Sequence, residues 1–209
     1  MLYRRTLLSI VAVASLTSSC GLFRPVNPNP NPSSPQPFDS VAATPIAEPS
    51  ALITDPGALN DAKIVAVVLA SNNTDISYAR LVPSRGERTD VKEYARRMLT
   101  DHASINGLLT ELTTQLDLTP EDNVVSLELR DESAAKRDQM RELSGYAFDS
   151  TYIENEVSYH RTFLYSIDNT LEPRARNDQL KTLLTSVRPV IAAHLAHAEQ
   201  VRANVLTRK

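Results

Sequence analysis

The chain has 209 residues, of which 22 are Lys or Arg and 25 are Asp or Glu, and its formal net charge is −3. A mildly acidic chain without basic runs or aromatic clusters lacks the features of nucleic-acid-binding proteins, so we expect no nucleic-acid partner. Its five glycines form neither a G-x-S-x-G elbow nor a phosphate-binding loop. Nucleophilic catalysis is therefore not indicated, and the sequence favours a protein that is not an enzyme without deciding the matter.

The first 19 residues have the pattern of a secretory signal peptide. Two arginines precede an apolar run from Leu7 to Leu16, and small residues follow. The run is shorter than the roughly 20 apolar residues of a membrane-spanning helix. The next residue, Cys20, is the only cysteine, and "LTSSC" resembles the lipobox of bacterial lipoproteins, although Leu16 stands four places before the cysteine instead of three. We expect lipidation at Cys20; the alternative is cleavage nearby with a free thiol.

Residues 20–54 have the composition of a linker. Eight of the thirteen prolines lie between Pro25 and Pro49, and such segments favour extended conformations and lack apolar side chains to bury. We expect a disordered spacer that holds a folded domain, residues 55–209, away from a membrane. The predicted location is the bacterial cell envelope, with the lipid in the outer membrane and the domain facing the periplasm.

From residue 55 onward, apolar residues recur at the spacing of helices and never alternate as in strands. The pattern predicts four helices, the third of them disturbed around Gly145: residues 58–82, 87–116, 126–171 and 178–207. Long helices with short connections are typical of an up-down four-helix bundle. We therefore predict an all-α domain of this architecture.

Polar side chains lie on or beside the apolar seam of every predicted helix. The residues on the seams are Asn72, Asp101, His160 and His194. Those beside the seams are Asp75, His102, the line of Asp149, Tyr152 and Glu156, and His197 one turn after His194. All four histidines of the chain are among them. Imidazole and carboxylate groups that meet in the core of a bundle suit a transition metal such as Zn or Fe, and also Cu or Ni.

The spacing of these residues leaves two interpretations open. The Glu-x-x-His pairs of carboxylate-bridged di-iron centres are absent; Glu156 with His160, and His194 with His197, are the nearest substitutes and favour a mononuclear or His-rich site. Alternatively, no metal binds and the histidines are satisfied by hydrogen bonds, since an unsatisfied buried polar group costs about 1 to 3 kcal/mol. Three partners are available for that purpose: Asp101, Asp149 and Tyr152.

Three segments resemble family 4142 of the domains of unknown function, whose ferritin-like members are predicted bacterial outer membrane or envelope proteins. The segments are "TDVKEYARRMLTDHASIN" (89–106), "GYAFDSTYIENEVSYH" (145–160) and "RPVIAAHLAHAEQV" (188–201). The family pattern falls on Asp101, His102, Phe148, Asp149, Tyr152, His160, Pro189 and His194. Asp75 stands where the family usually has Glu, and His197 is outside the pattern. The resemblance covers most of residues 58–206 and implies a ferritin-like bundle, but no activity.

The sequence thus favours a lipid-anchored envelope protein with a central cluster of His and carboxylate groups, used in metal binding or stress protection. The alternative is a structural or interaction lipoprotein that holds no metal, and a metal-dependent oxidase or hydrolase is a third reading. Apart from the membrane, the sequence indicates no particular partner and no oligomeric state.

Overall fold

The computed structural model describes residues 59–207, and every element in this part of the chain is helical. The five long helices are α1 (Asp61–Ala79), α3 (Thr89–Gln115), α4 (Val124–Arg141), α5 (Gly145–Ser166) and α7 (Asp178–Thr207). Three short elements connect them: α2 (Val82–Arg85), the π-helix η3 (Ile167–Leu171) and α6 (Glu172–Arg174). The predicted all-α class is confirmed. The predicted signal peptide, Cys20 and the linker lie outside the described residues, and none of the described helices is long and apolar enough to cross a membrane.

The predicted third helix is in fact two helices, α4 and α5. The first ends at Arg141, and the second begins at Gly145, whose φ of +58° is adopted by glycine at less cost than by other residues. A capping box fixes the start of α4, because the side chains of Asn123 and Ser126 each accept a hydrogen bond from the backbone N–H of the other. Helical spacing continues on both sides of the break, and the spacing alone therefore suggested one disturbed helix.

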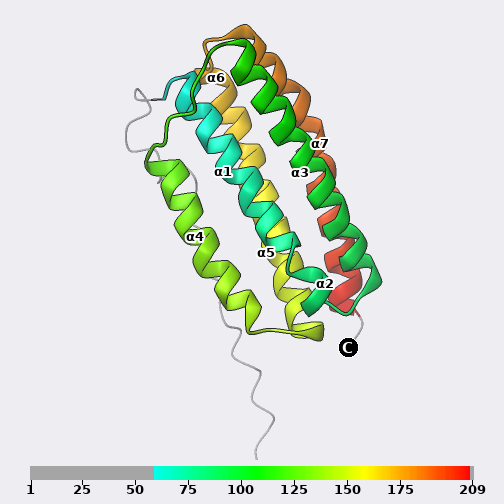
Figure 1. Ribbon diagram of the computed structural model, residues 1–209. Coiled ribbons are helices and arrows are strands. Elements are labelled where there is room, and N and C mark those ends of the chain that lie inside the picture. The colour runs from blue at the N-terminus through cyan, green and yellow to red at the C-terminus, as the bar shows by residue number, and fades with distance from the viewer. Residues whose placement is uncertain (1–58, 208–209) are drawn as a thin grey trace, which may run out of the picture. The chain divides into compact units, whose positions relative to one another are not determined.

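The extra helix changes the path of the chain. Followed along the colours of Figure 1, α1 runs downward, α3 upward, α4 downward, α5 upward and α7 downward. The predicted simple up-down order of four helices is therefore wrong: α4 carries the chain back along the domain, and α3 and α5 run in the same direction. Helix α1 packs against α3 and α4, while α7 packs against α3 and α5.

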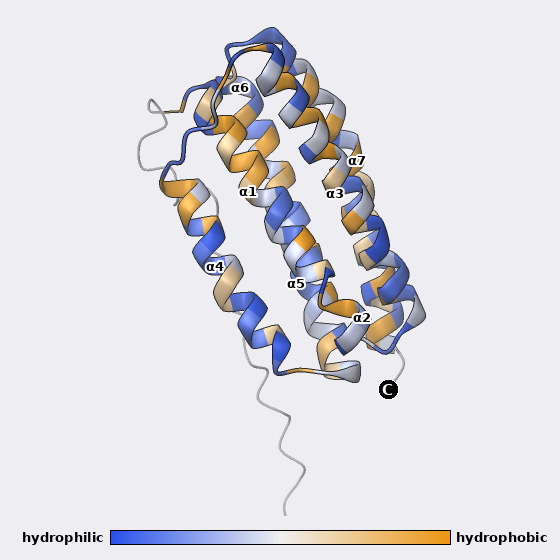
Figure 2. Cartoon of the chain, in the orientation of Figure 1, coloured by the Kyte–Doolittle hydropathy of each residue, from blue (hydrophilic) through white to orange (hydrophobic). Residues whose placement is uncertain are grey.

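Two apolar clusters fill the interior. One contains residues of the first half of α1, the second half of α3 and the first half of α7, including Ile64, Leu109 and Leu184. The other contains residues of the opposite halves of these helices and of the first half of α5, including Met98 and Ile153. Between them lies a level of buried polar side chains, and Figure 2 shows the corresponding change along α1, whose first turns are orange and are followed by a blue stretch.

Candidate metal centre

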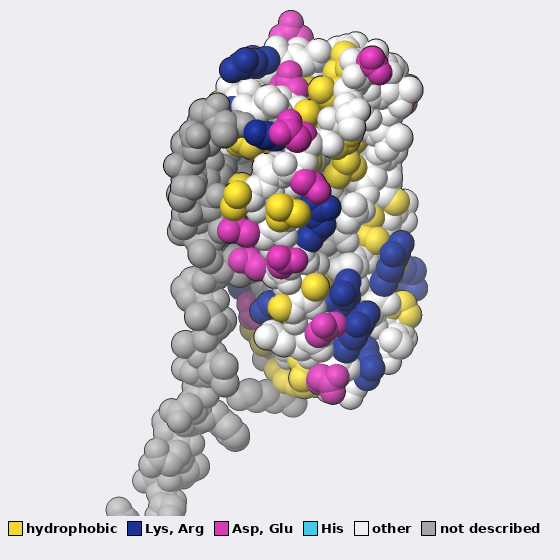
Figure 3. All heavy atoms as spheres, turned by 60° about the vertical axis from the view of Figure 1, so that its left-hand side comes forward, with side chains coloured by type: hydrophobic (Ala, Val, Ile, Leu, Met, Phe, Trp, Pro, Cys, Tyr) yellow, Lys and Arg dark blue, Asp and Glu magenta, His cyan; other side chains and the backbone are white. Residues whose placement is uncertain are grey.

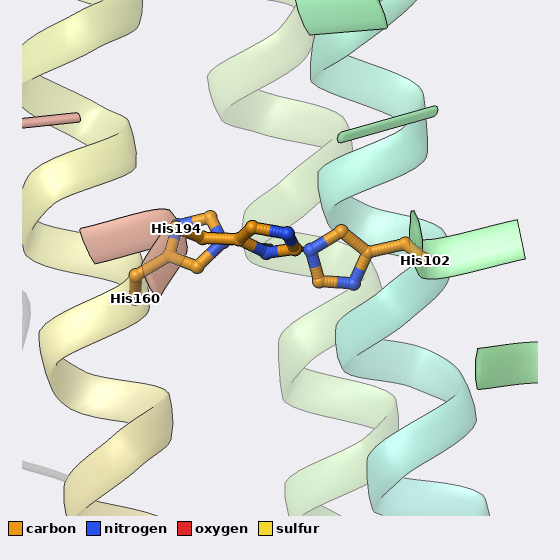
Figure 4. Close-up of side chains that lie close together, drawn as sticks. All are labelled: His102, His160 and His194. Atoms are coloured by element: carbon orange, nitrogen blue, oxygen red, sulfur yellow. Dashed lines mark hydrogen bonds between the residues drawn. The ribbon is translucent and has the colours of Figure 1, made fainter. Parts of the chain in front are cut away.

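Six polar side chains from four helices meet at the level between the two apolar clusters. They are Asn72 and Asp75 of α1, His102 of α3, Glu156 and His160 of α5, and His194 of α7, each at most 1% exposed. Figure 4 shows the three imidazole rings pointing toward one another. The structure thus brings together His102, His160, His194 and Asp75, four residues that the sequence pattern placed on separate predicted helices.

Each of the three imidazoles has one ring nitrogen held by a hydrogen-bond acceptor. His102 Nδ1 donates to Asn72 Oδ1 (2.9 Å), His160 Nδ1 to the backbone oxygen of Glu156 (3.0 Å), and His194 Nε2 to Asp101 Oδ2 (2.8 Å). A neutral imidazole that donates through one nitrogen carries a lone pair on the other. Metal-binding histidines are oriented by such acceptors, so all three rings are prepared to bind a cation.

The nitrogens with lone pairs lie at the separation of ligands on one ion. His102 Nε2 is 3.4 Å from His160 Nε2, and Asp75 Oδ2 is 3.5 Å from the first and 3.4 Å from the second. Two ligands bound tetrahedrally at about 2.1 Å lie about 3.4 Å apart. One ring nitrogen of His194 is within 4.8 Å of a ring nitrogen of each of the other two histidines. With these tautomers, Nε2 of His102, Nε2 of His160 and an ionised Asp75 are all acceptors, and a cation between them would replace their mutual repulsion with attraction.

A second carboxyl group adjoins the first. Asp75, Glu156 and His160 each offer a donor atom within 4.8 Å of the others, and Tyr94 donates its hydroxyl to Glu156 Oε2 over 3.4 Å. The carboxyl groups of Asp75 and Glu156 interact with each other; beyond that contact, Asp75 Oδ1 and Oδ2, Glu156 Oε1 and the nearby His194 Nδ1 make no hydrogen bond within the described part of the chain. Leaving such an atom unsatisfied costs about 1 to 3 kcal/mol, and a bound ion would satisfy several at once.

Burial determines which groups carry protons. It lowers the pKa of His102, His160 and His194 to about 4, so that all three are neutral ligands at pH 7. It raises the pKa of Asp75, and burial and the nearby charge of Asp75 raise the pKa of Glu156 well above its ordinary value. Without an ion, Glu156 therefore holds its proton more tightly than an exposed glutamate does. A divalent cation would allow both carboxylates to ionise in a site of zero net charge.

Asp149, another predicted member of the site, lies away from the histidines. Its Oδ2 accepts hydrogen bonds from the backbone N–H groups of Glu87 (3.2 Å) and Arg88 (2.9 Å), just before α3 begins. A side chain at Gly86 would have no room, because its Cβ would lie 2.7 Å from Asp149 Oδ1. Asp149 thus joins α5 to the start of α3, a structural contact that the sequence pattern did not distinguish from a ligand.

The remaining predicted residues surround the centre at greater distance. The buried ring of Tyr152 packs between Tyr94 and Phe148, with ring centroids 6.2 and 5.9 Å away, and burial followed by the charge of Glu156 raises the pKa of its hydroxyl. The ring of His197 lies 5.2 Å from that of Tyr94 and does not belong to the group of converging nitrogens. Asp101 acts through His194 and also pairs with Arg97 at 3.2 Å.

Three contributors were missed or undervalued in the sequence. Glu156 was noted only as the residue one turn before His160, yet it is fully buried beside Asp75. Neither Tyr94 nor Asn106 had a predicted role in the site. Asn106 Oδ1 accepts from Asn72 Nδ2 (2.9 Å) and so fixes the amide that orients His102. The spacing of four between Glu156 and His160 was the one available signal.

Comparison with known proteins gives one match. A family described as a domain of unknown function, DUF4142, matches residues 47–201. No curated protein and no solved structure matches the chain. The match spans the described helices almost completely and includes every residue of the candidate centre. The chain therefore belongs to the DUF4142 family.

Proposed function

We propose that this protein is a lipid-anchored protein of the bacterial cell envelope whose domain binds one transition-metal ion, such as Zn or Fe. The ligands are His102, His160 and His194 with Asp75, and Glu156 is a fifth donor. Three neutral nitrogens and carboxylate oxygens suit the divalent ions of zinc, iron, copper and nickel. In this proposal α1, α3, α5 and α7 form a ferritin-like four-helix bundle around the ion, with α4 packed outside it.

The observation that carries the proposal is the coordinated orientation of three histidines. Each has one ring nitrogen bound to an acceptor on a different residue. The Nε2 atoms of His102 and His160 converge with Asp75 at 3.5 and 3.4 Å, and a ring nitrogen of His194 lies within 4.8 Å of ring nitrogens of the other two histidines. A structural role for histidines in a core requires only that their hydrogen bonds be satisfied. It does not account for His194 Nδ1 without a partner beside two adjacent buried carboxyl groups.

Metal content provides the direct test. The full chain, produced without a histidine tag and incubated with zinc, iron(II), copper or nickel and then desalted, should retain about one ion per chain by elemental analysis. The triple variant His102→Ala, His160→Ala, His194→Ala should retain none. The matched control is His197→Ala, which removes a histidine of α7 outside the converging group and should bind like the unaltered protein.

The outcomes separate the two readings of the centre. Equal metal content in the unaltered protein and the triple variant would reject the metal site and favour a structural or interaction lipoprotein. The single variant His194→Ala should also lose metal. If His197→Ala loses as much metal as His194→Ala, the proposed ligand set is wrong. Circular dichroism on each variant establishes that its helices remain.

The anchor has a separate test. Cys20 lies outside the described residues, and its proposed lipidation is supported by the signal-like segment that precedes it. In cells that export the protein, Cys20→Ser should remain as an uncleaved precursor or appear in the soluble fraction. Unchanged fractionation with membranes would reject lipidation and leave the metal proposal untouched.

A further inference from the structure

A second polar pocket lies outside the proposed metal centre, between α1 and α4. Its volume is about 250 Å³, which is several times the roughly 30 Å³ that a water molecule occupies in the liquid. It is lined by Ala70, Asn73, Thr74, Ser77, Arg130, Ser133 and Arg137. Two lining residues are cationic and none is acidic. Figure 3, which brings the α4 side forward, shows Lys and Arg side chains gathered on the lower half of that face.

Arg137 is the unusual member of this pocket. Its side chain is half-buried, and its Nε atom is buried without a hydrogen-bond partner. Within residues 59–207 no carboxylate pairs with it, whereas the other two arginines of α4 each have one: Arg130 pairs with Asp122, and Arg141 with Asp138. A guanidinium group has five N–H donors and no acceptor. The buried Nε–H has no acceptor, and leaving a buried donor unsatisfied costs free energy; an anion in the pocket would supply the acceptor.

Neutral donors lie on the other walls of the pocket. Asn73 uses its Oδ1 to accept from Asn106 Nδ2 (3.0 Å), and its own NH₂ group makes no hydrogen bond with another described residue. Ser77 donates to the backbone oxygen of Thr74 (2.8 Å), and its Oγ lies 3.3 Å from Ser133 Oγ. The Ser133 hydroxyl can rotate toward a new acceptor. The pocket therefore offers donors from both helices and one cation without a counter-charge.

We propose that this pocket binds a small oxyanion, a phosphate or carboxylate group, with Arg137 as its principal contact and Asn73 and Ser133 as additional donors. The planar fork of an arginine matches the paired oxygens of such groups, which accept two parallel hydrogen bonds. Arg130, at the other end of the pocket, adds positive charge but remains paired with Asp122. This site shares no residue with the metal centre, so the proposal does not depend on whether a metal binds.

The test is calorimetric titration of the full chain with inorganic phosphate and, separately, with acetate, at an ionic strength held constant with chloride. We expect saturable binding of one anion per chain and a rise in the melting temperature. Arg137→Gln should weaken binding at least tenfold, and Arg137→Lys should weaken it less. The matched control is Arg141→Gln, which removes the same charge from α4 outside the pocket and should bind as the unaltered protein does.

A third arm distinguishes the source of the anion, because phosphate also occurs in lipid headgroups. Vesicles of phosphatidylcholine with and without phosphatidylglycerol are sedimented with the protein lacking its lipid, Cys20→Ser. Arg137-dependent binding to the anionic vesicles alone would assign the pocket to a headgroup phosphate. The proposal is overturned if neither the small anions nor the vesicles bind, or if Arg137→Gln and Arg141→Gln bind equally. Matching circular dichroism spectra show that a loss is not due to unfolding.

Discussion

The interior of this domain contains two kinds of layer, apolar and polar, that differ in what stabilises them. The apolar clusters on either side are filled by side chains such as Ile64 and Met98, which need nothing beyond close packing. The level between them contains Asp75 and Glu156, and three of their four carboxyl oxygens have no partner outside this pair within the described residues. The first kind of layer is complete as the chain folds, whereas in our proposal a bound ion completes the second. The four experiments below test this difference.

The largest expected effect is in an apolar layer. Leu184 is 1% exposed, and Leu184→Ala should lower the free energy of unfolding by about 2 to 5 kcal/mol, because it removes buried methyl groups and leaves a cavity. Urea denaturation in the presence of a chelator measures this. Added metal should leave the difference in free energy of unfolding between Leu184→Ala and the unaltered protein unchanged. If this difference disappears with metal, the apolar and polar layers are not independent.

Metal addition should have an effect of similar size through the polar layer. At a free concentration 1,000 times its dissociation constant, an ion that binds only the folded protein raises the free energy of unfolding by about 4 kcal/mol. The same urea experiment with and without zinc measures the increase. It should vanish in His160→Ala, whose nitrogen belongs to both groups of converging donors. Equal stabilisation of this variant would place the ion elsewhere.

A smaller effect is expected from the residue that orients His194. Asp101→Asn should weaken metal binding by about 10- to 100-fold, because it removes the carboxylate that holds the Nε2 proton of His194 and leaves Nδ1 free. Competition with a chromogenic chelator measures the change. Asp168→Asn is the control, since Asp168 also pairs with an arginine but on the surface, where it contacts Arg188 of α7. If both variants weaken metal binding equally, Asp101 acts only through its negative charge and not by orienting His194.

The smallest effect is expected outside both layers. Gly107 lies on the exposed side of α3, and a Cβ there would meet no atom within 4 Å. Gly107→Ala should raise the free energy of unfolding by up to about 1 kcal/mol through helix propensity alone. Thermal denaturation should show the same gain with and without metal. A loss of stability would reveal close packing at this position that the structure does not show.

The sequence was most informative where a residue type broke a regular pattern. His160 and His194 interrupt the apolar seams of two helices and His102 lies beside the seam of a third, and helical period therefore pointed them toward one axis. The period could not distinguish Asp149 from a ligand, because a hydrogen bond to the backbone of Glu87 and Arg88 depends on how two helices meet end to end.

The path of the chain was also beyond the reach of periodicity. A helical repeat says which face of a segment is buried, but not where the segment reverses direction. The break before Gly145 depends on a single positive φ angle, and it turned one predicted helix into two. For the same reason Glu156 was undervalued, since its burial beside Asp75 depends on the distance between α5 and α1.

The pairing of the helices gives the polar level a further significance for folding. Helices α1 and α3 are neighbours in sequence and pack together, as do α5 and α7, and such local pairs form readily. The first pair supplies Asp75 and His102, and the second supplies Glu156, His160 and His194. The candidate ligands thus lie across the seam between these two helix pairs. An ion bound there would hold the α1–α3 pair and the α5–α7 pair together. Its removal would weaken the contact between the two pairs before either pair unfolds.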